Sequence, residues 1–241
     1  MAPTPTVLLD LDGTLTDSRP GIVASYHAAL RSLGHEPDLG IDLTFVIGPP
    51  PEEIMPQVLA RYGDDRVTEA VALYREHYGR GGLFQNSVYG GIPEALAALA
   101  GAGCRLYVAT AKRTVFARRI LDHFGLSPAF HTIYGSEPGG ALDRKGDLIA
   151  HILGREAIRP ETAVMVGDRH HDIAGAQQNR LPSVGAAWGY GGGEELAAAG
   201  ADRVAGHPDD LAEAVLALLS PVPAGGTSPA TSRGTPPPAS A

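Results

Sequence analysis

The stretch that most constrains this chain is residues 6–17, TVLLDLDGTLTD, in which a short apolar run ends in closely spaced acids. An apolar run of this length, followed by Gly13, predicts a buried strand of a parallel sheet. Ligands bind at the carboxyl ends of such strands, and Asp10 and Asp12 would share one side of the extended chain there. Two neighbouring carboxylates repel each other unless a proton or a cation relieves them, and a hard divalent cation prefers oxygen ligands. The stretch therefore predicts a strand end that binds a ligand together with a cation.

The remainder of the chain predicts an α/β fold interrupted by a helical segment. After residue 89, strand patterns alternate with helical patterns, which predicts a Rossmann-like parallel sheet with right-handed crossovers. The expected strands cover 104–110, 131–135, 162–167, 182–187 and 202–205, and the expected helices cover 93–100, 114–124, 144–154, 172–179, 193–199 and 209–219. Residues 18–88 carry helical patterns at 22–33, 52–62 and 65–78, with an ambiguous apolar run at 41–47. We therefore predict a core domain of residues 1–17 and 89–220 with an inserted helical domain of residues 18–88.

Composition excludes several classes of function. The formal net charge is −8 without a long basic run, which argues against a nucleic acid partner. Cys104 is the only cysteine, so an intrachain disulfide and a site with several cysteine ligands are both excluded. The chain has neither a run long enough to span a membrane nor a signal-peptide pattern, so we expect a cytoplasmic monomer or homodimer without membrane contact. Residues 221–241, rich in Pro, Ala, Gly, Ser and Thr, predict a disordered tail, with a docking site as the alternative.

Further polar residues stand at later strand ends and helix starts. Thr110 ends the apolar strand that begins near residue 104, and Lys145 begins the helix after the loop at 135–144. Arg144 is its neighbour, but adjacent helix residues point about 100° apart. Asp168 and Asp172 follow another apolar strand in the pattern GDxxxD. These residues supply a hydroxyl group, a cation and two more carboxylates for a site at the strand ends.

These motifs resemble those of the haloacid dehalogenase-like hydrolases. DLDGTLTD is similar to the first motif of the phosphatases in that family, and Thr110, Lys145 and the GDxxxD pattern match the three later motifs in order. The resemblance covers residues 6 to about 219 and favours the branch that contains phosphoglycolate phosphatase-like and beta-phosphoglucomutase-like proteins with a helical cap. It implies that residues 18–88 form this cap.

The resemblance implies specific roles for the two acids of the first motif. Asp10 would attack phosphorus and form an aspartyl-phosphate, and its carboxylate would also bind Mg²⁺. Asp12 would act as general acid and then as general base, and its backbone carbonyl would contribute to the metal site. An aspartate at the Asp12 position favours phosphate-ester chemistry, because dehalogenases and P-type pumps of the family lack it.

The later motifs would bind the phosphoryl group and complete the metal site. The resemblance assigns the hydroxyl of Thr110, the backbone amide of Ala111 and the ammonium of Lys145 to the phosphoryl oxygens. It assigns Asp168 to Mg²⁺, directly or through a water molecule, and Asp172 to a metal-bound water. A helix-capping role for Asp172 is compatible with this assignment.

Other polar residues near these motifs have open interpretations. Lys112 and Arg113 could attract phosphate, or they could form a solvated basic turn. His170 and His171 do not predict zinc, since no third nitrogen or sulfur ligand stands at zinc-site spacing. They are expected at the rim of the site or against Asp172.

The helical cap would set the substrate and exclude water. Residues 47–50, IGPP, are similar to the cap segment that faces the active site in phosphoglycolate phosphatase-like proteins. Residues 16–18 and 81–82 are candidate hinges. Four basic residues could reach a second anionic group of the substrate, although surface solvation is the alternative for each: Arg19, His27, Arg61 and Arg80.

The sequence thus predicts a Mg²⁺-dependent phosphatase that hydrolyses small phosphorylated metabolites, phosphoglycolate-like or nucleotide-like, through an aspartyl-phosphate. One alternative is a phosphomutase with the same active site. Another is a signalling protein whose cap or tail binds a partner and whose activity is vestigial or related to protein-tyrosine phosphate. No glycine-rich P-loop or protein-kinase signature is present in the sequence.

Overall fold

The fold is built on a six-stranded parallel sheet with the strand order β5-β4-β1-β6-β7-β8. A computed structural model describes residues 4–140 and 142–219, so the predicted disordered tail at 221–241 lies outside the described residues. The strands are β1 (Thr6–Leu9), β4 (Arg105–Arg113), β5 (Thr132–Ser136), β6 (Ala163–Gly167), β7 (Ser183–Ala186) and β8 (Arg203–Ala205). The α/β fold class predicted from the sequence is confirmed, with β1 at the centre between β4 and β6.

Helices cover both faces of this sheet because successive residues of its buried strands point to opposite sides. Leu8 packs with residues of α6 and α7, whereas Val7 and Leu9 pack with residues of α4, α5 and α9 on the other face. The core helices are α4 (Ile92–Gly101), α5 (Thr114–His123), α6 (Lys145–Arg155), α7 (His170–Gln178), α8 (Gly192–Ala198) and α9 (Leu211–Leu219). The result is a three-layer core in which every strand end opens in the same direction.

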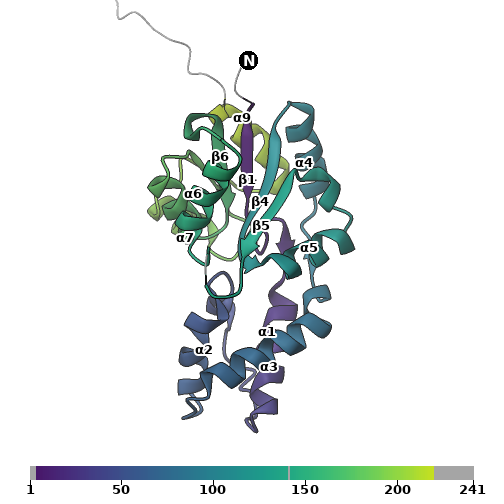
Figure 1. The fold of residues 1–241 in the computed structure, drawn as a ribbon, viewed down its shortest axis with the longest axis vertical. Helices are drawn as coiled ribbons and strands as arrows, with labels where there is room; N and C mark the ends of the chain where they lie inside the picture. The colour runs from purple at the N-terminus through teal and green to yellow at the C-terminus, as the bar shows by residue number, and fades with distance from the viewer. Residues whose placement is uncertain (1–3, 141, 220–241) are drawn as a thin grey trace, which may run out of the picture.

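The cap consists of three helices that lie beyond one end of the sheet, as Figure 1 shows. They are α1 (Arg19–Ser32), α2 (Pro51–Ala60) and α3 (Val67–Arg80), and α3 packs against both α1 and α2. Buried cap residues such as Tyr26 and Met55 belong to the same apolar cluster as Val7 of the core. The cap is therefore packed onto the core through a continuous apolar contact.

Two short strands join the cap to the core. β2 (Thr16–Asp17) leads into the cap, β3 (Ser87–Val88) leads out of it, and the two pair antiparallel. Strand β3 lies within residues 18–88, where no convincing strand was predicted, because a two-residue strand is too short to show an alternating pattern. Residues 81–82, expected as a hinge, differ in packing: a Cβ atom on Gly82 would lie 2.3 Å from the Oγ of Ser25 in α1, whereas a Cβ atom on Gly81 would meet no atom within 4 Å. The hinge role of this pair stays a prediction.

Most element bounds agree with the expected ranges within a few residues, with two informative differences. The ambiguous run at 41–47 contains a short 3-10 helix, Thr44–Val46, rather than a strand. Strand β4 continues three residues beyond Thr110, to Arg113, and pairs there with Ser136 of β5 after a register shift. Further 3-10 helices are Gly82–Phe84, Ser127–Ala129, Pro160–Thr162 and Pro208–Asp210. Among the described helices, none is long and apolar enough to cross a membrane.

Candidate active site

The turn after β1 places the first two acids at the carboxyl end of the sheet. Asp10 follows the last residue of β1, and its backbone N–H donates a 2.9 Å hydrogen bond to the carbonyl of Val166 in β6. Gly13 then reverses the chain with a φ of +83°, and its N–H donates to the carbonyl of Thr16 at 2.8 Å. A Cβ atom on Gly13 would lie 2.1 Å from the Oδ2 of Asp168. Glycine is thus required for both the left-handed backbone and the close approach of Asp168.

The ammonium group of Lys145 lies at the centre of the site. Its Nζ is 2.9 Å from Asp10 Oδ1 and 2.8 Å from Asp172 Oδ1, and it donates to the carbonyl of Ala109 at 2.8 Å. An ammonium group has three hydrogens, and three oxygens lie within 2.9 Å of this one. Burial alone would lower the pKa of Lys145, but the carboxylates of Asp10 and Asp172 outweigh burial and raise it above its ordinary value. Lys145 therefore stays charged and holds both acids in place.

Asp168 completes a group of three buried carboxylates. One oxygen from each of Asp10, Asp168 and Asp172 lies within 4.8 Å of the others. Burial, followed by the negative charges of Asp172 and Asp10, raises the pKa of Asp168 well above its ordinary value. Burial also raises the pKa of Asp172, with a further contribution from Asp10 that opposes the effect of Lys145.

This donor set fits a hard divalent cation. Three carboxylates converge, and Lys145 pairs with Asp10 and Asp172 but not with Asp168. The Asp168 carboxylate accepts a 2.8 Å hydrogen bond from the backbone N–H of Tyr190 and a 3.5 Å bond from the hydroxyl of Thr14. These neutral donors leave the raised pKa of Asp168 in place, and an oxygen-coordinated cation would lower it.

Thr110 lies at the end of the buried part of β4, next to the three acids. The residue is buried, and its Oγ1 accepts a 3.2 Å hydrogen bond from the backbone N–H of Lys112. This leaves the hydroxyl hydrogen of Thr110 available to donate. Thr110 and Ala111 both line the same cavity as Asp10 and Lys145.

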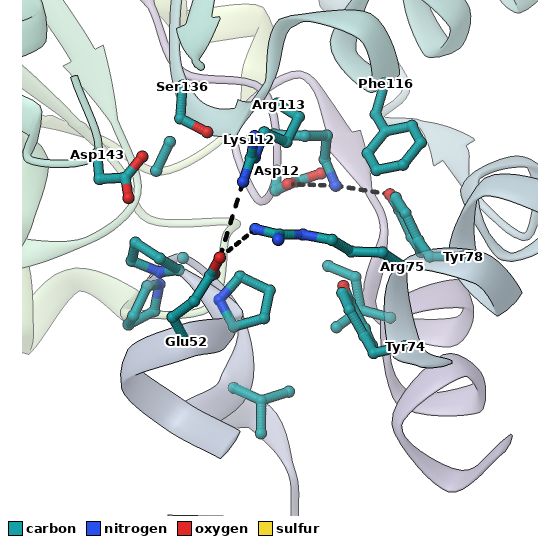
Figure 2. A pocket seen from close by; sticks show the side chains of 17 residues that line it. Asp12, Glu52, Tyr74, Arg75, Tyr78, Lys112, Arg113, Phe116, Ser136 and Asp143 are labelled. Atoms are coloured by element: carbon teal, nitrogen blue, oxygen red, sulfur yellow. Dashed lines mark hydrogen bonds and ion pairs between the residues drawn. The ribbon is translucent and has the colours of Figure 1, made fainter. Parts of the chain in front are cut away.

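Asp12 is bound by a lysine that sequence reasoning left open. Lys112 Nζ lies 2.8 Å from Asp12 Oδ2, and both side chains are almost fully buried. The same ammonium donates a 2.6 Å hydrogen bond to the hydroxyl of Tyr78 in α3 (Figure 2). Asp12 Oδ1 is buried without a hydrogen-bond partner among the described residues. Lys112 is thus no solvated turn residue, and Asp12 keeps one oxygen free for another ligand.

The acids face a cavity of about 220 Å³ between the core and the cap, which we call the reaction cavity. It brings together all predicted site residues except Asp168, which is fully buried behind it next to Asp10 and Asp172. The cap contributes the segment predicted to face the site, with Gly48 in a left-handed conformation at a φ of +107°. The lining residues from the cap are Gly48, Pro49, Pro50 and Glu53.

Arg169 joins the core to that cap segment. Its Nη1 donates a 2.9 Å hydrogen bond to the carbonyl of Ile47, and its Nε lies 3.0 Å from Glu195 Oε1. Burial alone would raise the pKa of Glu195, but hydrogen bonds from His170 and Arg169 lower it to about 2. His170 Nδ1 is 2.7 Å from Glu195, and His171 lines the reaction cavity. Sequence reasoning missed Arg169 because only the fold brings it to Ile47.

The basic residues proposed for a second anionic group lie elsewhere. Arg19 pairs with Asp42 at 3.0 Å, Arg80 pairs with Glu76 at 2.6 Å, and the guanidinium of Arg61 lies over the ring of Phe45. Of the described residues that line the reaction cavity, none is Arg19, His27, Arg61 or Arg80. The cap arginine that does approach the site is Arg75, which lines a neighbouring pocket and had no distinguishing sequence pattern.

Comparisons with known proteins agree with this geometry. The chain matches the model of a family described as haloacid dehalogenase-like hydrolase over residues 7–186. It is 47% identical to a protein named 5'-nucleotidase from Pseudomonas aeruginosa, over 80% of this chain and 87% of that protein. It is 43% identical to the tyrosine-protein kinase PtkA of Mycobacterium tuberculosis, over 77% of this chain and 62% of that protein. A solved structure described as a predicted phosphatase from Clostridium acetobutylicum superposes with a TM-score of 0.80 at 38% identity, covering 90% of this chain and 100% of that chain.

Proposed function

The chain belongs to the haloacid dehalogenase-like hydrolases and is a phosphatase of that family, and from this premise we propose that it hydrolyses small phosphomonoesters with the help of Mg²⁺. One observation carries the proposal: Lys145 binds Asp10 and Asp172 at the edge of a three-carboxylate group that also contains Asp168. A lysine held between a nucleophile and a metal ligand favours the transfer of an anionic group to the nucleophile.

In the first half-reaction, an oxygen of Asp10 attacks phosphorus and the ester P–O bond breaks. The leaving alkoxide takes a proton from Asp12, which lines the reaction cavity and whose Oδ1 has no hydrogen-bond partner among the described residues. The phosphoryl group is now bonded to Asp10, and its oxygens accept hydrogen bonds from Lys145 and from the available hydroxyl of Thr110.

In the second half-reaction, water attacks the phosphorus of the aspartyl-phosphate. Asp12 accepts the proton of this water, the bond between phosphorus and the Asp10 oxygen breaks, and phosphate leaves. Asp12 returns to its protonated state and Asp10 to its carboxylate, so the cycle closes.

Asp10, Asp168 and Asp172 would hold the cation, with the backbone carbonyl of Asp12 as a further ligand. When bound, the cation neutralises charge on the phosphoryl oxygens. Within this chain, Asp168 would bind it through the oxygens that now accept from Tyr190 and Thr14.

Phosphate release from a panel of phosphomonoesters tests this proposal, with Mg²⁺ and with EDTA. The panel contains phosphoglycolate, nucleoside monophosphates, sugar phosphates and a phosphotyrosine peptide. We expect Mg²⁺-dependent release that falls by about 10⁴-fold or more in Asp10→Asn, the scale found when a nucleophile is removed. Retained turnover in a folded Asp10→Asn protein would contradict the role of Asp10.

The phosphomutase remains the alternative on the same site. Phosphorus NMR of the reaction distinguishes the two, since a mutase returns an isomerised ester instead of free phosphate. A signalling role with vestigial activity would give neither product, and a phosphotyrosine-directed role would favour the peptide of the panel. The cytoplasmic location and the monomeric or homodimeric state stay predictions from the sequence.

A further inference from the structure

A second pocket lies beside the reaction cavity, between cap and core, and we call it the leaving-group pocket. Its volume is about 60 Å³, and it shares Asp12 and Lys112 with the reaction cavity. In the proposed reaction Asp12 gives its proton to the leaving oxygen, so the leaving group must lie next to Asp12. The pocket in Figure 2 is therefore the place where the chain can recognise the part of the substrate that differs between phosphomonoesters.

One wall of the leaving-group pocket is aromatic and apolar. The rings of Tyr74 and Tyr78 stack with centroids 5.7 Å apart, and Phe116 of α5 meets Tyr78 edge-on at 5.5 Å. Ile22 and Val46 complete this wall. Such a surface packs against carbon–hydrogen groups and provides no charge.

The other wall carries charges that are already balanced. Glu52 of α2 pairs with Arg75 of α3, and its Oε1 is 3.7 Å from Arg113 Nη2 at the end of β4. Lys112 pairs with Asp12 at 2.8 Å. The charged residues of the pocket are three cations and three acids: Arg75, Lys112, Arg113, Asp12, Glu52 and Asp143.

The pKa of Asp143 indicates how a carboxylate is affected by the charges of this wall. Burial and then the charge of Glu52 raise the pKa of Asp143, although Arg113 and Arg75 lower it. At Asp143, the two arginines therefore do not offset the combined effect of burial and Glu52 on the pKa. Arg144, which is exposed, lines the reaction cavity but does not line the leaving-group pocket.

We propose that the leaving-group pocket takes a neutral leaving group with hydroxyl groups, and that Glu52 excludes substrates with a second anionic group. This inference rests on the phosphatase activity proposed above and specifies its substrate class. Glu52 and Asp143 offer carboxylate oxygens that accept hydrogen bonds from hydroxyl groups, and the aromatic wall packs against the carbon skeleton. A substrate carboxylate would instead be repelled by Glu52 and Asp143. Arg75 and Arg113 would compensate little for this repulsion, because Glu52 already pairs with both of them.

Matched substrate pairs test the inference on the wild-type protein. 2-Hydroxyethyl phosphate differs from phosphoglycolate only by a hydroxymethyl group in place of a carboxylate, and glycerol 3-phosphate differs from 3-phosphoglycerate in the same way. Adenosine monophosphate and ribose 5-phosphate extend the neutral series to larger leaving groups. With Mg²⁺ at fixed ionic strength, we expect kcat/KM to be about tenfold higher for the neutral member of each pair, the scale of one unit charge across several Å.

Glu52→Gln tests the residue itself. The variant leaves Arg75 and Arg113 without their shared acid, so kcat/KM for the acidic member of each pair should rise about tenfold. The value for the neutral member should not rise, because the variant replaces a carboxylate that accepts hydrogen bonds from its hydroxyl groups with a weaker amide acceptor. Glu76→Gln is the matched control: it removes the same charge from a half-exposed glutamate of α3 that pairs with Arg80, outside both cavities, and should leave the ratio unchanged.

Each outcome decides between distinct failures. Hydrolysis of no panel member would overturn the proposed function and this inference with it. Hydrolysis with a preference for phosphoglycolate and 3-phosphoglycerate would keep the phosphatase and overturn the inference, since the arginines would then bind the second anion. An equal change for both members of a pair in Glu52→Gln, or the same change in Glu76→Gln, would overturn the role of Glu52.

Discussion

The ammonium group of Lys112, at the end of a core strand, donates a 2.6 Å hydrogen bond to the hydroxyl of Tyr78 on a cap helix. The same ammonium lies 2.8 Å from Asp12 Oδ2 and 4.4 Å from the centre of the Tyr78 ring. The residue proposed to carry protons is therefore connected to the cap through a single core lysine. Packing of the cap and placement of Asp12 are coupled by this contact.

Tyr78→Phe should lower kcat because the phenolic oxygen that orients Lys112 is lost. A hydrogen bond to a charged group contributes about 1.5–3 kcal/mol, so we expect a fall in kcat of about tenfold or more, with a smaller change in KM. Tyr74→Phe is the control, since it removes a hydroxyl from the same pocket wall and leaves the hydrogen bond between Lys112 and Tyr78 in place. Steady-state kinetics on a hydrolysed phosphomonoester measure both, and equal effects of the two variants would contradict the coupling.

Lys145→Met should abolish activity and destabilise the protein. It leaves Asp10 and Asp172 buried without their shared cation. Removing one partner of a buried ion pair costs about 3–5 kcal/mol. Urea unfolding in EDTA measures the loss, and Mg²⁺ should restore part of it by neutralising the same acids. A variant as stable as the wild-type protein in EDTA would show that the acids do not depend on Lys145.

Metal-free protein should lose stability as pH rises. The pKa of Asp168 is raised in the folded protein, so the unfolded chain gives up this proton at lower pH than the folded one. The stabilising contribution is complete below the ordinary pKa of aspartate and is lost as pH rises towards the raised value. Mg²⁺ should remove this loss, so its effect on Tm should grow from pH 5 to pH 8 and reach about 5 °C or more at saturation.

Thermal unfolding with Mg²⁺ and with EDTA at several pH values measures this effect. Asp168→Asn is the control, because an amide neither titrates nor carries the charge that binds the cation. It should be more stable than the wild-type protein in EDTA at pH 8 and should gain little from Mg²⁺. A pH-independent effect of Mg²⁺ on the wild-type Tm would exclude Asp168 as the responsible group.

Gly13→Ala should lower the free energy of unfolding by more than the cost of placing alanine in a left-handed backbone conformation. Gly34 has a similar φ of +91° with no atom within 4 Å of an added Cβ, so Gly34→Ala measures the backbone cost, about 1–2 kcal/mol. Gly13→Ala adds a contact of 2.1 Å with Asp168 Oδ2. We expect a larger loss in the free energy of unfolding and a loss of activity, because Asp168 must move. Equal costs in chemical denaturation would show that the site yields without strain.

Most of the fold was predictable because its signals are local. Apolar strands with a buried pattern on both faces alternate with helical periods, and only a parallel sheet satisfies this order. The strands β2 and β3 were not predictable, since two residues each give no period and their pairing joins positions 16–17 to 87–88. The continuation of β4 to Arg113 depends on its partner strand β5 and not on its own polar sequence.

The candidate site divides in the same way. Asp10, Asp12, Thr110, Lys145, Asp168 and Asp172 stand at strand ends and helix starts, which the sequence marks. The partners that adjust them come from distant positions: Tyr78 reaches Lys112 from the cap, and Glu195 holds Arg169. Such pairs depend on how the cap and the last helices dock, which no local pattern encodes. Among the cap residues of the leaving-group pocket, Glu52 was the easiest to anticipate from the sequence, because it stands just after the IGPP segment predicted to face the site.

The paired strands β2 and β3 place the entrance and the exit of the cap side by side. A segment whose two ends meet in space can be lengthened, shortened or exchanged without stretching the sheet to which it is attached. Asp10, Lys145, Asp168 and Asp172 all lie outside this segment, whereas Glu52, Arg75 and Tyr78 lie within it. The architecture therefore allows the reaction and the substrate preference to evolve separately. The cap can diverge in evolution, or be replaced by an engineer, while the core keeps the residues proposed for the reaction.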